Sequence, residues 1–206
     1  MKVVIVGGGN VGRALASGWS KAGHSVSVAV RDTGKSELAE LKARGIAIIP
    51  SSGAASAADV IVLATPWGAV EGALKGLGAL AGKIVIDATN PLTRDYGLAV
   101  GHTDSGGETV ARLAPGARVV KAFNTTGFGN MANGHYAGGK VMMAVAGDDA
   151  EAKKVTMQLA GDLGFEPIDA GPLTMSRYLE PMAMVWIKCA MVQKMGRDFG
   201  FAVLRR

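Results

Sequence analysis

The sequence predicts an α/β protein built on a doubly wound, mostly parallel β-sheet, followed by a C-terminal helical segment. Short apolar runs rich in β-branched residues alternate with helical patterns along most of the 206 residues, as expected for a parallel sheet covered on both faces. The first run, residues 2–6, stops at a glycine turn that leads into a helix and a second apolar run. Strand, glycine turn, helix and strand in that order indicate a Rossmann-type dinucleotide-binding unit.

The glycine turn has the composition that pyrophosphate binding requires. Gly7 lets the chain turn sharply from the strand, Gly9 removes a Cβ where a pyrophosphate approaches the backbone, and Gly12 lets the helix pack closely on the strand. The free N–H groups and the positive dipole end of that helix favour an anion. We therefore expect the whole turn to hold the cofactor pyrophosphate: Gly7, Gly8, Gly9, Asn10, Val11 and Gly12.

Apolar runs bounded by turn residues define the first half of the sheet. Strands are expected at residues 2–6, 26–30, 46–49, 59–64 and 83–87. Helical spacing of apolar residues predicts a helix after the glycine turn, with Val11, Leu15 and Trp19 on one stripe, and further helices at 36–44 and 69–80. The small polar segment 51–58 predicts a loop with one helical turn. Right-handed crossovers would then place the C-terminal ends of all strands at one edge of the sheet, where ligands bind.

The second half continues the alternation. After the loop at 93–104, Ser105 and Glu108 form a capping box that begins a helix ending at Leu113. Further strands are expected at 118–123, 140–146 and 165–169, with a helix between the last two that Asp148 or Asp149 caps and that ends near residue 163.

The last segment is helical and apolar on nearly all sides from Thr174 to about Arg197. Such a helix is buried on several sides, and little chain remains to cover it. We therefore divide the chain into a nucleotide-binding domain, residues 1–172, and a C-terminal helical segment, residues 173–206. The segment is expected to form a homodimer interface and a wall of the acceptor site.

Composition limits the class of partner. The net charge is +5 with three histidines, and the basic residues are scattered, so we expect no nucleic-acid partner. Arg177, Glu180 and Lys188 interrupt the apolar C-terminal stretch, so we expect no membrane span. The single cysteine, Cys189, is expected to be a buried thiol in a reducing compartment. With a first strand beginning at residue 2 and no room for a signal peptide, the expected location is cytoplasmic.

The end of the second strand distinguishes NADP from NAD. A carboxylate there would bind the ribose diol, whereas Arg or Lys would pair with a 2′-phosphate. Asp32 lies twenty residues past Gly12 and could serve NAD. Strand alternation instead makes Arg31 the first polar side chain at the edge, with Lys35 close behind, and Asp32 belongs to a turn. The pattern favours NADP.

Two further strand ends are expected to line the cofactor, because they meet the glycine turn at the same edge. The fourth strand ends at Ala64, Thr65, Pro66 and Trp67. The fifth strand leads into Ala88, Asn90 and Pro91.

No residue is singled out as catalytic. Tyr136 and Lys140 have the spacing of a Tyr-x-x-x-Lys acid–base pair, but the glycines between them make a poor helix, and we reject it. No Ser–His–acid set, metal-ligand cluster or Walker motif is present, and the roles of His102 and His135 stay open. Hydride transfer between a nicotinamide and a flavin-like ring needs positioning more than a protein proton donor.

Six motifs spread over nearly the whole chain form a recognisable set. They are the glycine turn, Arg31 with Lys35, and four later segments: 65–67, 121–124 (Lys-Ala-Phe-Asn), 147–149 (Gly-Asp-Asp) and 169–173 (Asp-Ala-Gly-Pro-Leu). Together they resemble the F420-dependent NADP oxidoreductase family. The cytosolic NADPH domain of the six-transmembrane ferric reductases is similar too, and shares Lys-Ala-Phe-Asn.

The resemblance implies NADP as cofactor, with Arg31 and Lys35 at the 2′-phosphate and residues 65–67 beside the nicotinamide ribose. Asn124 and Thr125 would stand where the two rings meet. Gly8 and Val30 replace hydroxyl residues of the deazaflavin enzymes, so the acceptor stays open among F420, FMN, FAD and another small molecule. The alternative is a non-catalytic NADPH-binding sensor. A hydroxyacid dehydrogenase comes third, because the chain is too short for that family's helical second domain.

Overall fold

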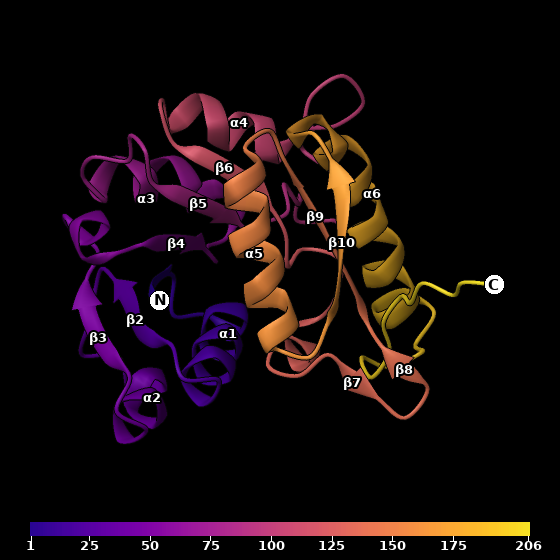
Figure 1. Ribbon diagram of the computed structural model, residues 1–206, viewed down its shortest axis with the longest axis horizontal. Coiled ribbons are helices and arrows are strands. Elements are labelled where there is room, and N and C mark those ends of the chain that lie inside the picture. Colours follow the sequence, from indigo (N-terminus) through magenta and orange to yellow (C-terminus); the bar gives the residue numbers. More distant parts are fainter.

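The computed structural model describes residues 1–206 and contains one eight-stranded sheet with helices on both faces (Figure 1). The strand order across the sheet is β10-β9-β6-β5-β4-β1-β2-β3. The strand bounds are β1 (Lys2–Val6), β2 (Ser25–Val30), β3 (Ala47–Pro50), β4 (Val60–Leu63), β5 (Ile84–Asp87), β6 (Arg118–Lys121), β9 (Met142–Gly147) and β10 (Glu166–Gly171). A separate hairpin pairs β7 (His135–Tyr136) with β8 (Gly139–Lys140). The predicted α/β class is confirmed.

The six neighbouring strands from β3 to β6 are all parallel. Because β1 pairs with β2 on one side and with β4 on the other, the strand order reverses between β1 and β4. Ligands of doubly wound sheets bind beyond the C-terminal strand ends at such a reversal. The glycine turn follows β1 and Thr65 follows β4, so both lie at this point.

The last two strands run the other way. β9 pairs with β6 antiparallel, with Lys121 opposite Ala146, and β10 is parallel to β9. The prediction that all strand C-terminal ends share one edge is therefore wrong for β9 and β10. A parallel neighbour needs a crossover connection, usually a helix, and residues 122–141 supply only a 3₁₀ turn (Phe128–Asn130) and the β7–β8 hairpin.

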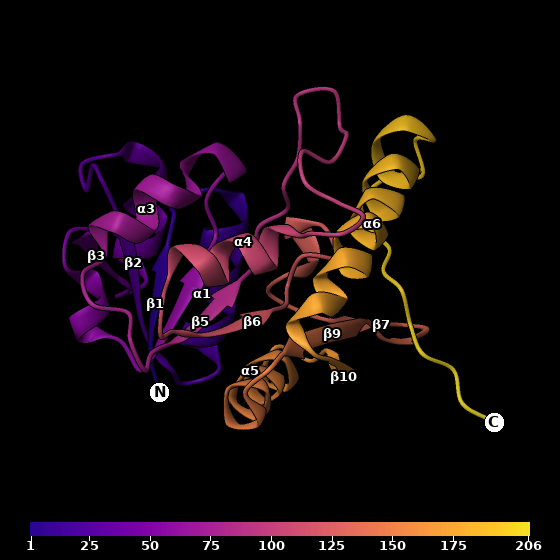
Figure 2. The same ribbon diagram turned by 90° about the horizontal axis from the view of Figure 1, so that it is seen from above.

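Helices cover both faces of the sheet. Their bounds are α1 (Asn10–Lys21), α2 (Ala39–Ala43), α3 (Val70–Gly76), α4 (Gly106–Leu113), α5 (Ala150–Asp162) and α6 (Ser176–Ile187). α3 is shorter than predicted because Gly78, with φ of 91°, adopts a left-handed conformation that ends the helix. In Figure 2 the loop between β5 and α4 rises beyond the strand ends.

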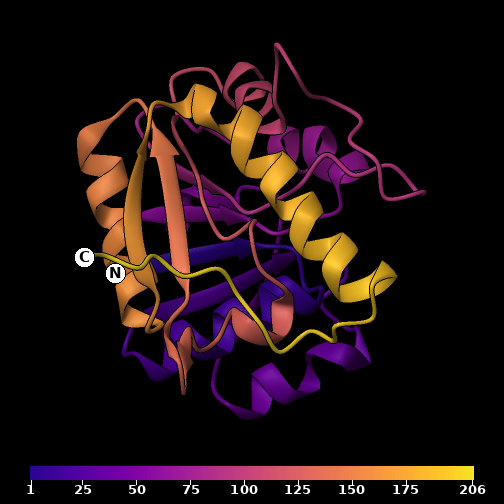
Figure 3. The same cartoon turned by 90° about the vertical axis from the view of Figure 1, so that its right-hand side faces the viewer.

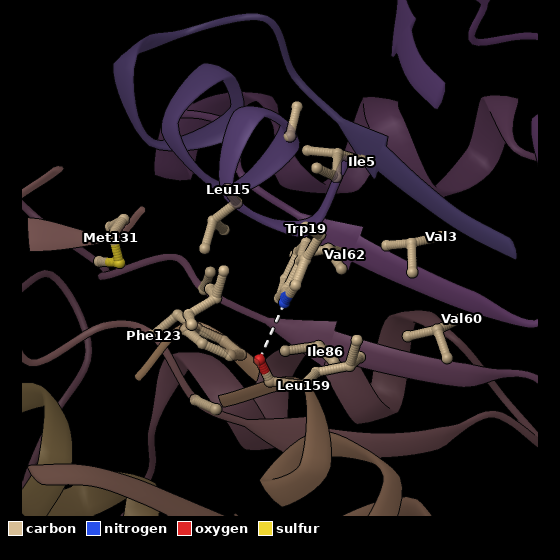
Figure 4. Packing of buried hydrophobic residues seen from close by; sticks show 14 of the residues in the cluster. Val3, Ile5, Leu15, Trp19, Val60, Val62, Ile86, Phe123, Met131 and Leu159 are labelled. Atoms are coloured by element: carbon tan, nitrogen blue, oxygen red, sulfur yellow. Dashed lines mark hydrogen bonds between the residues drawn. The ribbon is translucent and has the colours of Figure 1, made fainter. Parts of the chain in front are cut away.

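The larger part of the core lies between the sheet and the helices α1 and α5 (Figure 4). Trp19 of α1 is fully buried, and its Nε1 donates to the backbone carbonyl of Leu159 in α5 at 2.9 Å. Its ring meets Phe123 edge to face at 5.3 Å between centroids, an arrangement favoured by aromatic quadrupoles. The core thus fixes α1 against the sheet, and with it the glycine turn.

α6 lies across the end of the sheet that carries β9 and β10 (Figure 3). The predicted helix to Arg197 ends earlier, with a π-helical turn (Lys188–Val192). The remaining tail runs back toward β9, where the Met142 N–H donates to the Phe201 carbonyl at 2.7 Å.

Cys189 is partly exposed, so the expectation of a buried thiol is wrong. No helix of the structure combines the length and apolarity that crossing a membrane would require.

Candidate functional site

The glycine turn packs directly against the end of β4. Gly7 has φ of 117°, and a Cβ there would lie 2.5 Å from the Ala64 carbonyl oxygen. A Cβ on Gly12 would lie 2.0 Å from the Gly7 carbonyl oxygen, and one on Gly8 would lie 2.8 Å from Leu38. Backbone carbonyls therefore close Gly7 and Gly12 to side chains, whereas at Gly8 only the end of the Leu38 side chain would have to shift. A Cβ on Gly9 would meet nothing within 4 Å, so space remains there for a ligand.

The N-terminus of α1 is left without a protein partner. Gly9 is its N-cap, no side chain caps it, and its first turn holds no acidic residue. By contrast, Ser105 caps α4 and Asp149 caps α5 through side-chain oxygens, which confirms both predicted caps. An uncapped helix start that follows a glycine turn at the strand reversal can bind a phosphate group.

Cationic side chains lie at the neighbouring strand end. Arg31 and Lys35 follow β2 and are both exposed. Asp32 accepts the Gly34 N–H at 2.9 Å, so it closes the predicted turn. Arg13 of α1, which sequence reasoning missed, donates to the Glu37 carbonyl at 3.1 Å and so lies against the segment that carries Lys35. Its position in the first turns of α1, close to the glycine turn, was the sequence feature that could have identified it.

The ends of β4 and β5 approach each other across the start of α4. Trp67 begins a 3₁₀ turn (Trp67–Ala69) after the exposed Pro66, and Pro91 and Ala88 are buried. A Cβ on Gly106 would come within 3.2 Å of both the Trp67 ring and Pro91. The Thr65 hydroxyl at this strand end is buried without a hydrogen-bond partner in the protein.

Asn90 and Asn124 bind each other across the ends of β5 and β6. The Asn90 Nδ2 donates to the Asn124 backbone carbonyl at 2.9 Å, and the Asn124 Nδ2 donates to the Asn90 Oδ1 at 3.0 Å. The Asn124 Nδ2 also donates to the Leu179 carbonyl of α6 at 3.1 Å. Thr125 beside it is buried. The structure thus brings two predicted site residues together with α6.

A buried ion network below this pair was not foreseen as part of the site. The Lys121 Nζ lies 2.9 Å from the Asp87 Oδ2 and 2.8 Å from the Glu180 Oε1, and none of the three side chains is more than 1% exposed. Burial alone would lower the pKa of the Lys121 ammonium, but the two carboxylates raise it by more. Lys121 belongs to the Lys-Ala-Phe-Asn motif, but nothing in the sequence identified Asp87 and Glu180 as its partners.

A hollow of about 460 Å³ separates α6 from the loop after β5. It is lined by Leu98, Gly101, His102, Thr103, Arg177, Tyr178 and Pro181. Arg177 donates to the Glu108 carboxylate at 2.6 and 2.9 Å, which ties α6 to α4. Arg177 holds the pKa of the Glu108 carboxyl below its usual value.

The remaining candidates lie apart from these contacts. Tyr136 is in β7 and Lys140 in β8, so no helix face joins them, as expected. The Tyr136 hydroxyl donates to the Asn130 side chain. His135 is exposed in the same hairpin and packs on Gly164.

Comparison with known proteins identifies the family. Residues 2–91 match the family described as NADP oxidoreductase, coenzyme F420-dependent. Over the full length of both chains, the protein is 32% identical to a candidate F420-dependent NADP reductase from Arthrobacter sp. FB24, with a TM-score of 0.89. The chain belongs to the F420-dependent NADP oxidoreductase family. It is thus a member of a family of NADP-dependent oxidoreductases.

Two further relatives lie close to this family member. It is 31% identical over 183 residues to the metalloreductase STEAP3 of Rattus norvegicus. That match covers 89% of this chain and 36% of the rat protein, so the chain spans about a third of that relative. A hypothetical protein of Sinorhizobium meliloti, SMa0349, is 28% identical with a TM-score of 0.75, over 85% of this chain and 87% of that one.

Proposed function

We propose that this family member transfers a hydride directly from NADPH to the ring of a deazaflavin such as F420, or of a flavin such as FMN or FAD. The roles that the sequence suggests for individual cofactor-binding residues are part of this proposal. The uncapped start of α1 and the space at Gly9 would receive the pyrophosphate. Arg31 and Lys35 would pair with the 2′-phosphate.

The observation that carries the choice of acceptor is that the titratable groups directly behind the carboxamide pair are bonded to one another. The titratable groups behind Asn90 and Asn124 are Asp87, Lys121 and Glu180, and each is buried and bonded within its own network. Reduction of a carbonyl or imine ordinarily needs a positioned proton donor. Transfer to a flavin-type ring needs orientation and exclusion of water.

NADPH, when bound, would supply the hydride, the acceptor ring would take it up, and solvent would supply the balancing proton. Residues of the chain would hold the geometry. Asn90 and Asn124 present fixed carboxamides, Thr65 presents an unpaired hydroxyl, and α6 would form the wall on the acceptor side.

A labelling experiment tests the proposal. NADPH deuterated at C4 would be mixed with the protein and F420, and the reduced deazaflavin would be analysed by mass spectrometry. Deuterium at C5 supports direct ring-to-ring transfer, since that position does not exchange with water. Parallel assays would follow NADPH absorbance with FMN, FAD or a ferric chelate. No turnover with any acceptor would contradict the proposal and favour an NADPH-binding sensor.

A further inference from the structure

Three buried charges join the elements that carry the ring wall. Asp87 ends β5, Lys121 ends β6 and Glu180 lies in α6. The Lys121 Nζ donates to the Asp87 Oδ2 at 2.9 Å and to the Thr89 carbonyl at 2.6 Å, and it forms an ion pair with the Glu180 Oε1 at 2.8 Å. Three oxygens therefore surround the buried ammonium group and hold it in place.

The two carboxylates are held just as fully. Glu180 accepts the N–H groups of Gly106 and Gly107, the first residues of α4, at 2.9 and 3.0 Å. The Asp87 Oδ1 accepts the Thr89 N–H at 2.9 Å and the Thr89 hydroxyl at 2.7 Å. The network thus connects β5, β6, α4 and α6 at a single buried point.

Stability alone does not account for such a network. Two carboxylates and one ammonium sum to one buried negative charge, and removing charges from water costs as much as their attraction returns. Apolar side chains of similar volume often stabilise a fold equally well. A polar network in which every group is satisfied does, however, fix a unique geometry.

The network lies next to each member of the carboxamide pair. Asn90 follows Asp87 by three residues, and Asn124 follows Lys121 by three. Leu179, whose carbonyl accepts the Asn124 Nδ2 at 3.1 Å, precedes Glu180. Any shift of Lys121 relative to its carboxylates would therefore move the supports of both carboxamides.

We propose that Lys121, Asp87 and Glu180 are positioning residues that fix the Asn90–Asn124 pair, and with it the nicotinamide ring, against α6. This inference rests on the proposed function, which places the nicotinamide beside that pair. None of the three residues would touch the cofactor. They would act by holding the carboxamides and the α6 backbone in one arrangement.

The test is Glu180→Gln, which keeps the side-chain size and leaves Lys121 paired with Asp87. Binding of NADPH would be compared with binding of 2′-phospho-ADP-ribose, which lacks the nicotinamide. We expect the affinity for this fragment to be unchanged and the extra affinity for NADPH to fall by about tenfold. The single-turnover rate of hydride transfer should fall on the order of 10²-fold, as for a misplacement of about 1 Å.

A purely structural role gives a different result. Partial unfolding lowers the number of binding sites, but it leaves the affinity ratio and the rate per occupied site unchanged, and that outcome would overturn the proposal. The matched control is Arg118→Met, which removes an ion pair with Asp149 at the opposite end of β6 and should change neither quantity. If Glu180→Gln does not fold, Thr89→Val removes one bond to Asp87 and should shift the ratio in the same direction; an unchanged ratio would contradict the proposal.

The affinity ratio needs no acceptor, so the two proposals can fail separately. A wild-type protein that reduces no acceptor would contradict the proposed hydride transfer, while the nicotinamide contribution to binding could still depend on Glu180. A protein that reduces F420 while Glu180→Gln leaves the ratio and the rate unchanged would contradict only the positioning role.

Discussion

The carboxamides of Asn90 and Asn124 fix each other's orientation. The Asn124 Nδ2 faces two acceptors, the Asn90 Oδ1 at 3.0 Å and the Leu179 carbonyl at 3.1 Å, so its amide cannot be flipped without placing oxygen against oxygen. Its Oδ1 is consequently left buried without a partner. An unsatisfied buried acceptor costs about 1–3 kcal/mol. The structure therefore accepts this cost in order to hold the Asn124 amide on its two acceptors.

Arg31, at the end of β2, should favour binding of NADPH over NADH. We expect Arg31→Ala to weaken NADPH binding by about 1.5–3 kcal/mol, typical of a charge-assisted bond, and to leave NADH binding unchanged. Titration with each cofactor measures the difference. Arg44→Ala is the control, because Arg44 pairs with Glu40 on the exposed surface of α2. Equal losses for NADPH and NADH would remove Arg31 from the 2′-phosphate.

Substituting Gly9 and Gly12 should distinguish the effect of the turn on NADPH affinity from its effect on stability. Gly9→Ala adds a methyl group where no protein atom lies within 4 Å, so stability should change by less than about 1 kcal/mol. NADPH affinity should fall by at least about tenfold, because that methyl group would enter the pyrophosphate space. Gly12→Ala would place its Cβ 2.0 Å from the Gly7 carbonyl oxygen and should cost about 1–3 kcal/mol of stability.

Urea denaturation and NADPH titration of both variants give these quantities. A Gly9→Ala protein that binds NADPH as the wild type does would show that the pyrophosphate does not approach this turn. A Gly12→Ala protein of wild-type stability would mean that the α1–β1 contact adapts more readily than the structure indicates.

The fold could be read from local patterns, but strand direction could not. The run at 84–87 and the run at 142–147 are both short and apolar, and nothing within either distinguishes a parallel from an antiparallel neighbour. The direction of β9 depends on its connection to β6, which lacks a crossover helix. Hydrophobic periodicity reports burial and leaves this topology open.

In the site, likewise, the sequence predicted the local features but not the contacts between distant residues. The glycine turn and the caps at Ser105 and Asp149 act through neighbours in sequence, so their residue types predict them. Lys121 and Glu180 meet only after β6 and α6 are packed, and a single sequence contains no signal for that pairing. Phe123, buried with φ of 58°, is likewise a left-handed residue imposed by packing at a position where an aromatic side chain disfavours it.

The Arg177–Glu108 pair between α6 and α4 should make stability depend on acid pH. The hydrogen bond from Arg177 lowers the pKa of the Glu108 carboxyl below its ordinary value. A carboxyl with a depressed pKa in the folded state adds stability above its unfolded pKa, and that stability is lost as pH falls through the folded pKa. We expect Arg177→Gln to lower the free energy of unfolding at pH 7.

That difference should shrink as pH falls below about 4.5. The pKa of Asp104 is lowered chiefly by its hydrogen bond with Arg112 and to a smaller extent by the charge of Arg177, so it contributes with the same sign. Urea titrations of wild type and variant across this range measure the difference, in which other carboxylates cancel. A difference that stays constant down to pH 2 would show that Arg177 stabilises the contact between α6 and α4 by packing alone. Arg44→Gln, which breaks an exposed pair in α2, is the control and should show at most a few tenths of a kcal/mol.

We propose that the exposed apolar face at the end of α6 contacts a second copy of the chain. Val185 of α6, Val192 of the π-helical turn that follows it and Met195 just beyond that turn are 54–62% exposed. Exposed apolar side chains close together commonly mark an interface. Light scattering at micromolar concentration should give twice the chain mass of 21.0 kDa. Val185→Glu combined with Val192→Glu should give the single-chain mass, because a pair of charges would be buried without partners. Leu204→Glu, on the tail and 92% exposed, should leave the dimer intact. A wild-type mass of a single chain would contradict the proposal.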